Sequence, residues 1–220
     1  MADFEIEKYF FDRGYRFIAG VDEVGRGALC GPVIAAAVVW PPSLIEEFGD
    51  KKSGQQTVCG PRWFEQIKDS KLLTAKKRRE LSRFILSEAE SVGVGLCTNK
   101  EIDQKNIFWA SLEAMRRAVE RMPCRPEVVL VDGFELRGIP YVQQAIRGGD
   151  QKSYSIAAAS IVAKVLRDRI MDLCDGIFSG YALGKNKGYG TREHFQALEK
   201  LGPASFHRKT FRLQLEKKLF

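Results

Sequence analysis

The stretch AGVDEVGRGALCGPVIAAAVV, residues 19–39, decides the fold of this chain. It overlaps two apolar runs, residues 17–24 and 33–40, and the glycine-rich segment GRGALCGP lies between them. Short apolar runs that are rich in β-branched residues and bounded by glycine and proline are typical of strands joined by a turn. Because the runs are apolar at nearly every position, we expect a sheet that is covered on both faces.

Outward from this stretch, the apolar periodicity predicts alternating helices and strands. Thr74 can cap a helix over 75–89, and a long helix over 155–174 opens with the small residues SIAAAS. Residues 41–68, rich in Pro, Gly, Lys and Gln without a clear period, are expected to form a surface insertion or long loop. The order favours a three-layer α/β fold with a helical C-terminal extension. The remaining predicted elements are strands over 92–97 and 128–131 and helices over 107–121, 191–201 and 211–219.

The charge of the chain is distributed unevenly. Lys and Arg number 35 against 28 Asp and Glu, and the net charge of +7 comes entirely from residues 111–220. Residues 185–220 alone hold nine basic and three acidic side chains, a net of +6. Such a surface suits a polyanion, and if several of the last basic residues, Arg208, Lys209, Arg212, Lys217 and Lys218, contact phosphates, their removal should weaken binding to a duplex of any sequence. On charge alone, a merely solvated basic helix is the alternative.

Several classes of protein are excluded. The longest uncharged stretch, 27–45, is interrupted by Gly31-Pro32 and Pro41-Pro42, so we expect no membrane span. The N-terminal residues MADFEIEKYFFDRGYR lack the apolar core of a secretory signal. The cysteines, at positions 30, 59, 97, 124 and 174, form no CxxC pair, which predicts reduced thiols and a cytoplasmic location. With only two histidines, His194 and His207, a structural zinc site is not expected.

Carboxylates stand where apolar residues would be usual. Asp22 and Glu23 interrupt one predicted strand, Asp132 ends another, and Asp150 closes a glycine turn before the long helix. Acids that converge on one sheet edge repel each other unless divalent cations hold them, and carboxylates suit Mg²⁺ or Mn²⁺. The pattern favours a two-metal site for phosphodiester hydrolysis.

Two alternatives to this interpretation stay open. A strand-ending Asp-Gly pair such as Asp132-Gly133 is usually a turn signal. In addition, the neighbouring strand residues Asp22 and Glu23 should point to opposite faces of the sheet. Either the strand is distorted there, or Glu23 contacts a metal partly through its main chain.

At this point the chain resembles a known family, the type 2 ribonucleases H, and in particular bacterial ribonuclease HII. The resemblance lies in five blocks that occur in order over nearly the whole chain: AGVDEVGRGALCGPVIAAAVV at 19–39, DSKLL at 69–73, VDG at 131–133, GGDQKSYSIAAASIVAKVLRD at 148–168, and NKGYGTREHFQAL with HRKTF between 186 and 211. It implies an RNase H-like fold with a mixed central sheet, a catalytic domain over 1–184 and a basic helical extension over 185–220 packed on it.

The resemblance also implies site residues and an activity. Asp22, Glu23, Asp132 and Asp150 would bind two Mg²⁺ or Mn²⁺ ions. The implied activity is endonucleolytic cleavage of RNA paired with DNA, and 5′ of a single ribonucleotide in duplex DNA, leaving 3′-hydroxyl and 5′-phosphate ends. The residues that the resemblance places at the substrate are Gly25-Arg26-Gly27 at the 2′-hydroxyl, Tyr189 at the sugar of the RNA-to-DNA junction, and Lys71 and Lys187 near phosphates.

Other positions depart from the family or carry structural expectations. Ala28 stands where the family commonly has proline. Lys164 and Asp168, four residues apart on the long helix, are expected to form a salt bridge. Nothing supports a general-base role for His194 or His207.

The expected partners are RNA–DNA hybrids and ribonucleotide-containing duplex DNA. We expect a monomer without membrane contact. Gln214-Leu215 with Leu219-Phe220 only faintly resembles a sliding-clamp peptide. The alternatives are another RNase H-like nuclease, such as a junction resolvase, and a non-catalytic nucleic-acid-binding protein.

Overall fold

A mixed five-stranded sheet forms the centre of the molecule. The computed structural model describes residues 2–49, 66–67 and 73–213. The strand order is β3-β2-β1-β4-β5. β1 pairs antiparallel with β2 and parallel with β4, β2 pairs antiparallel with β3, and β4 pairs parallel with β5, as the resemblance implied. The strands are β1 (Ile18–Val24), β2 (Val33–Val39), β3 (Ser91–Cys97), β4 (Val128–Asp132) and β5 (Val142–Ile146).

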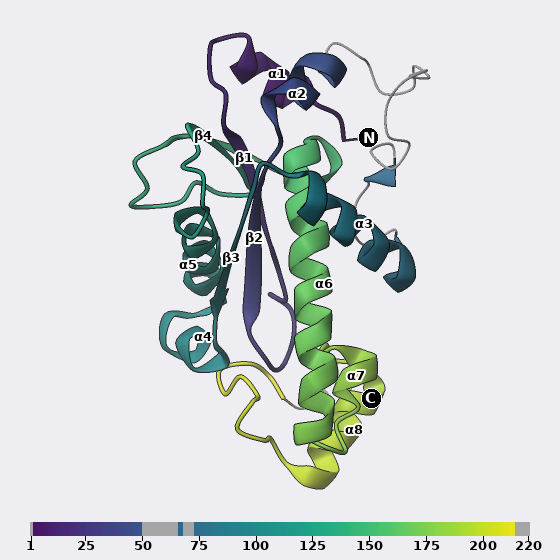
Figure 1. Cartoon of the computed structure of the whole chain (residues 1–220). Coiled ribbons are helices and arrows are strands. Elements are labelled where there is room, and N and C mark those ends of the chain that lie inside the picture. Colours follow the sequence, from purple (N-terminus) through teal and green to yellow (C-terminus); the bar gives the residue numbers. More distant parts are fainter. Residues whose placement is uncertain (1, 50–65, 68–72, 214–220) are drawn as a thin grey trace, which may run out of the picture.

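Helices cover both faces of the sheet, which confirms the predicted three layers (Figure 1). The long helix α6 (Tyr154–Ile177), with α3 (Ala75–Glu88) against it, lies on one face. α5 (Ile107–Glu120), with α4 (Asn99–Lys105) against it, lies on the other. The remaining elements are α1 (Glu5–Phe11), α2 (Pro42–Phe48), the 3₁₀ turn η2 (Gly149–Gln151), α7 (Leu183–Asn186) and α8 (Arg192–Leu201).

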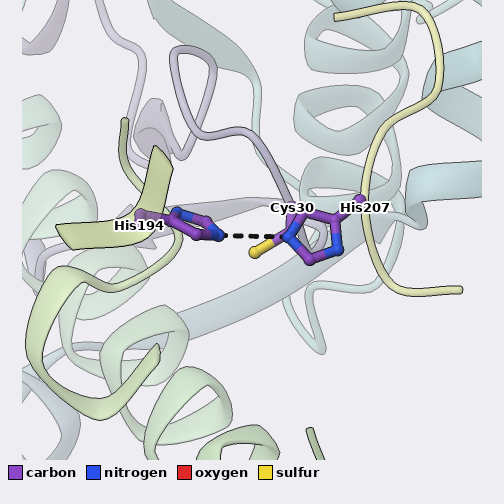
Figure 2. A group of neighbouring side chains, drawn as sticks. All are labelled: Cys30, His194 and His207. Atoms are coloured by element: carbon purple, nitrogen blue, oxygen red, sulfur yellow. Dashed lines mark hydrogen bonds between the residues drawn. The ribbon is translucent and has the colours of Figure 1, made fainter. Parts of the chain in front are cut away.

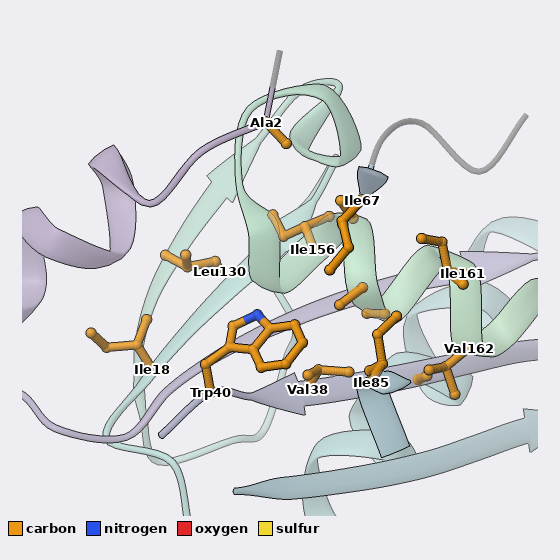
Figure 3. Packing of buried hydrophobic residues seen from close by; sticks show 14 of the residues in the cluster. Ala2, Ile18, Val38, Trp40, Ile67, Ile85, Leu130, Ile156, Ile161 and Val162 are labelled. Atoms are coloured by element: carbon orange, nitrogen blue, oxygen red, sulfur yellow. The ribbon is translucent and has the colours of Figure 1, made fainter. Parts of the chain in front are cut away.

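Each face of the sheet has its own hydrophobic core. Successive side chains of a strand point to opposite faces, so Ile18 packs with Trp40 and Ile156 on the α6 side (Figure 3). Ala19 and Val21 pack on the α5 side. Every residue of β2 is buried, as expected of a strand covered on both faces. No helix in the described ranges is long and apolar enough to cross a membrane.

Gly20 allows α6 to lie directly on β1. A Cβ atom built on Gly20 would stand 2.2 Å from the Ser155 carbonyl carbon and 2.3 Å from the Ile156 nitrogen. Both are backbone atoms, so a side chain at position 20 cannot be accommodated by a rotamer change. The close approach holds the first turns of α6 against the strand that carries Asp22.

We expect Gly20→Ala to lower the free energy of unfolding by about 3 kcal/mol or more, because inserting even one methyl group against backbone forces the strand and helix apart. Urea unfolding monitored by circular dichroism measures the loss. Gly176→Ala is the matched control: Gly176 lies in α6 with nothing within 4 Å of a built Cβ. Its replacement should stabilise by about 0.5–1 kcal/mol through helix propensity. Equal effects from the two variants would refute the close-packing argument.

Most predicted elements are confirmed within a few residues. α3 begins after Thr74, whose side chain accepts a hydrogen bond from the Lys77 N–H as predicted. Sequence reasoning missed β5, because VQQAI is polar and mostly exposed at the edge of the sheet. It also missed α2, which lies inside the segment expected to be a loop, and α1 and α4. No helix begins at Phe211: residues 211–213 are irregular, and 214–220 lie outside the described residues.

The C-terminal segment packs onto the rest of the chain through a third core. Leu29, Cys30 and Met171 contact Leu183 and Leu198 in this cluster. The predicted boundary after residue 184 falls inside α7, so the backbone shows no break there. The division into two domains stays a prediction.

Candidate active site

A cleft opens where β1 and β4 end. The parallel register pairs Val21 with Val131, so the next residues, Asp22 and Asp132, lie side by side. The cleft has a volume of about 290 Å³. Its lining combines three acids, a glycine-containing loop, two α6 residues and one tyrosine: Asp22, Glu23, Val24, Gly25, Arg26, Gly27, Asp132, Ser160, Lys164 and Tyr189.

Asp22 and Glu23 reach the same cleft although they are neighbours on one strand. Asp22 follows Ile18 and Gly20 on the α6 side, whereas Glu23 follows Ala19 and Val21 on the α5 side. The cleft lies beyond the strand end, where side chains of both faces can enter it. The Glu23 N–H donates to Asp22 Oδ1 at 2.7 Å, which orients the Asp22 carboxylate along the chain. A contact through the Glu23 main chain is therefore not needed.

Asp22 is buried, Glu23 and Asp132 are half-buried, and the three acids repel one another. Burial, followed by the charge of Glu23, raises the pKa of Asp22 well above its usual range. Burial also raises the pKa of Glu23 to about 7, against the attraction of Arg26, whose Nη1 lies 3.3 Å from Glu23 Oε1. Asp132 adds to the repulsion on both. Hard oxygen donors in this electrostatic state fit Mg²⁺ or Mn²⁺, because a dication relieves their repulsion.

Without divalent ions, we expect Glu23→Gln to be more stable than the wild type at pH 8. The pKa of Glu23 is about 7 in the folded state and about 4.5 in the unfolded state. Below pH 4.5 the Glu23 side chain is neutral in both states and costs the folded state nothing. As pH rises through 7 it becomes charged in the folded protein, and the free energy of unfolding of the wild type falls relative to that of Glu23→Gln. The gain should be on the order of 1–3 kcal/mol at pH 8 and should vanish below pH 4.5. Thermal unfolding in a chelator measures it, with the exposed-acid variant Glu199→Gln as control.

Added Mg²⁺ gives the complementary readout. It should stabilise the wild type more than Glu23→Gln, since binding to the folded state alone stabilises by mass action. If Glu23→Gln were less stable than the wild type at pH 8 in a chelator, the inference that Asp22, Glu23 and Asp132 repel one another would be wrong.

Asp150 lies next to this cluster rather than in the lining of the cleft. It is buried in η2, and the preceding residue, Gly149, donates its N–H to Asp132 Oδ1 at 2.8 Å. η2 therefore fixes the orientation of Asp132 from the backbone. Membership of Asp150 in the ligand set stays a prediction.

The loop of Gly25-Arg26-Gly27 forms one wall of the cleft, and Tyr189 stands beside it. Gly25 has φ +105°, and a built Cβ would lie 2.2 Å from Arg167 Nε, so only glycine fits. Ala28 and Tyr189 form an antiparallel bridge, and the Leu29 N–H donates to the Gly188 carbonyl at 2.7 Å. The structure thus brings the two predicted recognition elements together although Gly27 and Tyr189 lie 162 positions apart in the sequence.

The predicted lysines and basic C-terminal residues have different surroundings. Lys71 lies outside the described residues. The Lys187 ammonium pairs with Asp172 and donates to the Gly184 carbonyl, and it does not line the cleft. Lys164 and Asp168 form the predicted salt bridge at 2.5 Å. Arg208, one of the basic residues counted in the C-terminal segment, does not lie on the surface: its side chain is fully buried.

Sequence reasoning missed two members of the cleft lining. Ser160 and Lys164 lie four residues apart on the face of α6 that points at the carboxylates, and the Ser160 side chain forms a hydrogen bond with Asp22. For Lys164 the sequence favours a structural role, in a salt bridge with Asp168, over a functional one. Two polar residues four positions apart lie on the same face of a helix, and in an otherwise apolar helix this pattern could have indicated that Ser160 and Lys164 face a functional site.

The mixed sheet, the helices on both of its faces and the acids at adjacent strand ends define the class of ribonuclease H-like nucleases. Comparison with known proteins agrees. The family model of ribonuclease HII matches residues 61–214. A ribonuclease HII of Moorella thermoacetica is 47% identical over 200 residues, covering 91% of this chain and 88% of its own length.

Solved structures share the fold. The ribonuclease H2 of Pyrococcus horikoshii superposes with a TM-score of 0.68 at 25% identity, covering 90% of this chain and 94% of that one. The ribonuclease HII of Archaeoglobus fulgidus, solved in a complex with PCNA, gives 0.69 at 23% identity, covering 92% and 98%. The chain belongs to the ribonuclease HII family. It is an endoribonuclease of the type 2 ribonuclease H class.

Proposed function

We propose that this endoribonuclease hydrolyses the RNA strand of RNA–DNA hybrids and also cleaves on the 5′ side of a single ribonucleotide within duplex DNA. The observation that carries the proposal is the shared cleft: three carboxylates and the Gly25–Gly27 loop with Tyr189 line one volume. Acids alone would suit many nucleases. The adjoining loop adds a means of reading the sugar next to the bond that is cut.

Asp22, Glu23 and Asp132, with Asp150 as the predicted fourth ligand, would hold Mg²⁺ or Mn²⁺. When bound, such ions lower the pKa of a water molecule and neutralise charge on the leaving 3′ oxygen. The protein's own groups support this site. The η2 backbone orients Asp132, the Ser160 hydroxyl orients Asp22, and the Lys164 ammonium adds a positive charge at the wall where a phosphate would lie.

The loop offers hydrogen-bond donors to the substrate. The N–H groups of Arg26 and Gly27 donate to no other group of the described chain, and both residues line the cleft. Only the 2′-hydroxyl distinguishes RNA from DNA at a given position, and glycines let the backbone come close to it. The ring of Tyr189 lies 5.3 Å from the Arg167 guanidinium carbon, a cation–π contact that supports the ring from behind.

Further properties follow from the proposed substrate. We infer that the enzyme works in the cytoplasm, where the DNA of a bacterium lies, as a monomer whose basic C-terminal half favours a nucleic-acid duplex. Contact with a sliding clamp through Gln214-Leu215 and Leu219-Phe220 remains a weaker proposal. Those residues lie outside the described part of the chain.

The proposal is tested by cleavage in Mg²⁺ of four labelled substrates: a duplex DNA with one ribonucleotide, an RNA–DNA hybrid, an all-DNA duplex and a four-way junction. We expect nicking of the first two only, with 3′-hydroxyl and 5′-phosphate ends. Cleavage of the junction alone would identify a resolvase. Retention of substrate without turnover would identify a binding protein. Either result would overturn the proposed specificity.

A further inference from the structure

Residues 206–208 lie beside residues 29–31, which follow the loop of Gly25–Gly27. The Gly31 N–H donates to the Phe206 carbonyl at 3.0 Å, and the Arg208 N–H donates to the Leu29 carbonyl at 2.9 Å. Cys30 and His207 form an antiparallel bridge between these hydrogen bonds. The pairing places two adjacent side chains, His207 and Arg208, behind the two loops that line the cleft.

Arg208 holds the loop of Gly25–Gly27 from inside. Its guanidinium donates to the carbonyls of Gly25 at 2.8 Å, Arg26 at 2.9 Å and Gly31 at 3.0 Å. Within the described ranges it forms no ion pair. Burial lowers the pKa of Arg208 only to about 10, so the group stays charged at neutral pH. A buried guanidinium is costly unless it is hydrogen-bonded, and here three carbonyl groups accept from it while its central carbon lies 5.0 Å from the centre of the Phe211 ring.

The carbonyls that Arg208 binds determine where the neighbouring amides point. In a trans peptide, the C=O and the following N–H point in opposite directions. Because the Gly25 and Arg26 carbonyls face the buried Arg208, the N–H groups of Arg26 and Gly27 face away from it. These are the two N–H groups that donate to nothing else in the described chain.

His207 reaches the other loop through His194, and both rings are buried (Figure 2). The Tyr189 carbonyl can only accept, so His194 Nδ1, 3.0 Å away, carries a proton and donates to it. The neutral His194 ring then accepts at Nε2 from the Nε2–H of His207, 3.1 Å away. His207 Nδ1 is therefore unprotonated: it accepts from the Ala204 N–H at 3.0 Å, and its 3.3 Å approach to the Ala204 carbonyl is not a hydrogen bond. The Thr191 N–H also donates to the Tyr189 carbonyl, at 2.8 Å.

Cys30 lies close to both rings, and the three ligand atoms are within 4.8 Å of one another. A thiol with two imidazoles could hold a cation such as Zn²⁺. However, Arg167 and Arg208 already bring positive charge to this sulfur, and burial raises the pKa of the Cys30 thiol to about 12. A dication would add to this buried positive charge, whereas the neutral hydrogen-bonded pair adds none.

We propose that His207 and Arg208 are positioning residues that set the Gly25–Gly27 loop and Tyr189 in register for reading a ribonucleotide. This rests on the proposed function, since it assigns how that recognition surface is held. Arg208 directs the free amides outward, and the His207–His194 pair holds the Tyr189 backbone. Residues 206–208 thereby connect the Gly25–Gly27 loop with the loop of Tyr189, which lies far from it in the sequence.

The histidine pair is tested directly by ¹⁵N NMR of histidine-labelled protein, which contains only these two rings. At pH 7.5 we expect His194 as the Nδ1–H tautomer and His207 as the Nε2–H tautomer. The two Nε2 nuclei should show a scalar coupling across the hydrogen bond between the rings. The spectrum should stay unchanged on addition of Zn²⁺. Ring N–H protons that exchange rapidly with solvent, rings that average between tautomers, or ring resonances that shift when Zn²⁺ is added would overturn the proposed hydrogen bonds from His207 to His194 and from His194 to the Tyr189 carbonyl.

Positioning is tested by single-turnover cleavage with Arg208→Lys, which keeps the charge but loses the planar fork. We expect the rate constant on the single-ribonucleotide duplex to fall at least about tenfold, while the dissociation constant of that duplex changes less than about threefold. His207→Gln, which keeps a donor near Nε2, should retain more activity than His207→Leu. Ser205→Ala changes an exposed side chain of the same segment and should match the wild type.

The outcomes separate this inference from the proposed function. A wild-type enzyme that fails to nick the ribonucleotide substrate overturns the function itself. A normal wild type together with a fully active Arg208→Lys overturns the positioning role. The role would be merely structural if each variant lost as much activity on the RNA–DNA hybrid as on the single-ribonucleotide duplex, and if the losses among the variants paralleled the decrease in their melting temperatures.

If Arg208→Lys does not fold, the orientation of the amides is still testable. Asp132→Asn protein is mixed with a single-ribonucleotide duplex or with an all-DNA duplex of the same sequence. The amide resonances of Arg26 and Gly27 should shift specifically with the ribonucleotide. Identical shifts with the two duplexes would overturn the proposal.

Discussion

Asp132→Asn should reduce hydrolysis in Mg²⁺ by at least about a thousandfold while leaving duplex binding largely intact. The substitution keeps the Oδ1 atom that accepts the Gly149 N–H at 2.8 Å, so the strand end and η2 should stay in place. It removes a negative charge that divalent ions need and relieves the repulsion on Asp22 and Glu23. Single-turnover cleavage and a separate binding titration distinguish the two effects.

Asp12→Asn is the matched control for this prediction, since Asp12 is an exposed acid that pairs with Lys8 at 2.6 Å and is absent from the lining of the cleft. It should cleave like the wild type. Asp22→Asn should lose activity as Asp132→Asn does, and Asp150→Asn tests the fourth acid. Near wild-type cleavage by Asp132→Asn would show that the metal site has been assigned wrongly.

Tyr189→Ala should lower the single-turnover rate on one ribonucleotide in duplex DNA by on the order of a hundredfold, because a misplacement of about 1 Å costs that much. The loss should be smaller on a continuous hybrid, where several 2′-hydroxyl groups can restore the register. The Tyr189 backbone is held by its own hydrogen bonds, so the loop should keep its shape. Tyr189 is not among the proposed metal ligands, so Mn²⁺ affinity should not change.

Tyr9→Ala is the control for Tyr189→Ala, because Tyr9 is an exposed tyrosine outside the cleft whose ring also packs against an arginine. It should not affect either substrate. An equal loss on both substrates for Tyr189→Ala would refute the junction role. No loss on either would make Tyr189 an incidental member of the cleft wall.

The sequence by itself determined the secondary elements whose signals are local. β1, β2 and β4 are mostly apolar runs, and α6 follows a long apolar pattern, so their residues carry the information without help from the rest of the chain. The same holds for Asp22, Glu23 and Asp132: an acid inside or at the end of a buried strand is unusual enough to indicate a site. The family blocks added the role of Tyr189, which no local pattern indicates.

Only the tertiary structure decided how distant groups meet. The edge strand β5 is polar and gains its place from pairing with β4, which no local period reveals. Arg208, counted from composition as a surface charge, is buried because three carbonyls of a distant loop satisfy it. His194 and His207 become a fixed pair only when α8 and the final segment pack together. The physical reason is the same in each case: burial and hydrogen-bond partners depend on which segments are adjacent in space, and sequence spacing fixes adjacency only within one helix or strand.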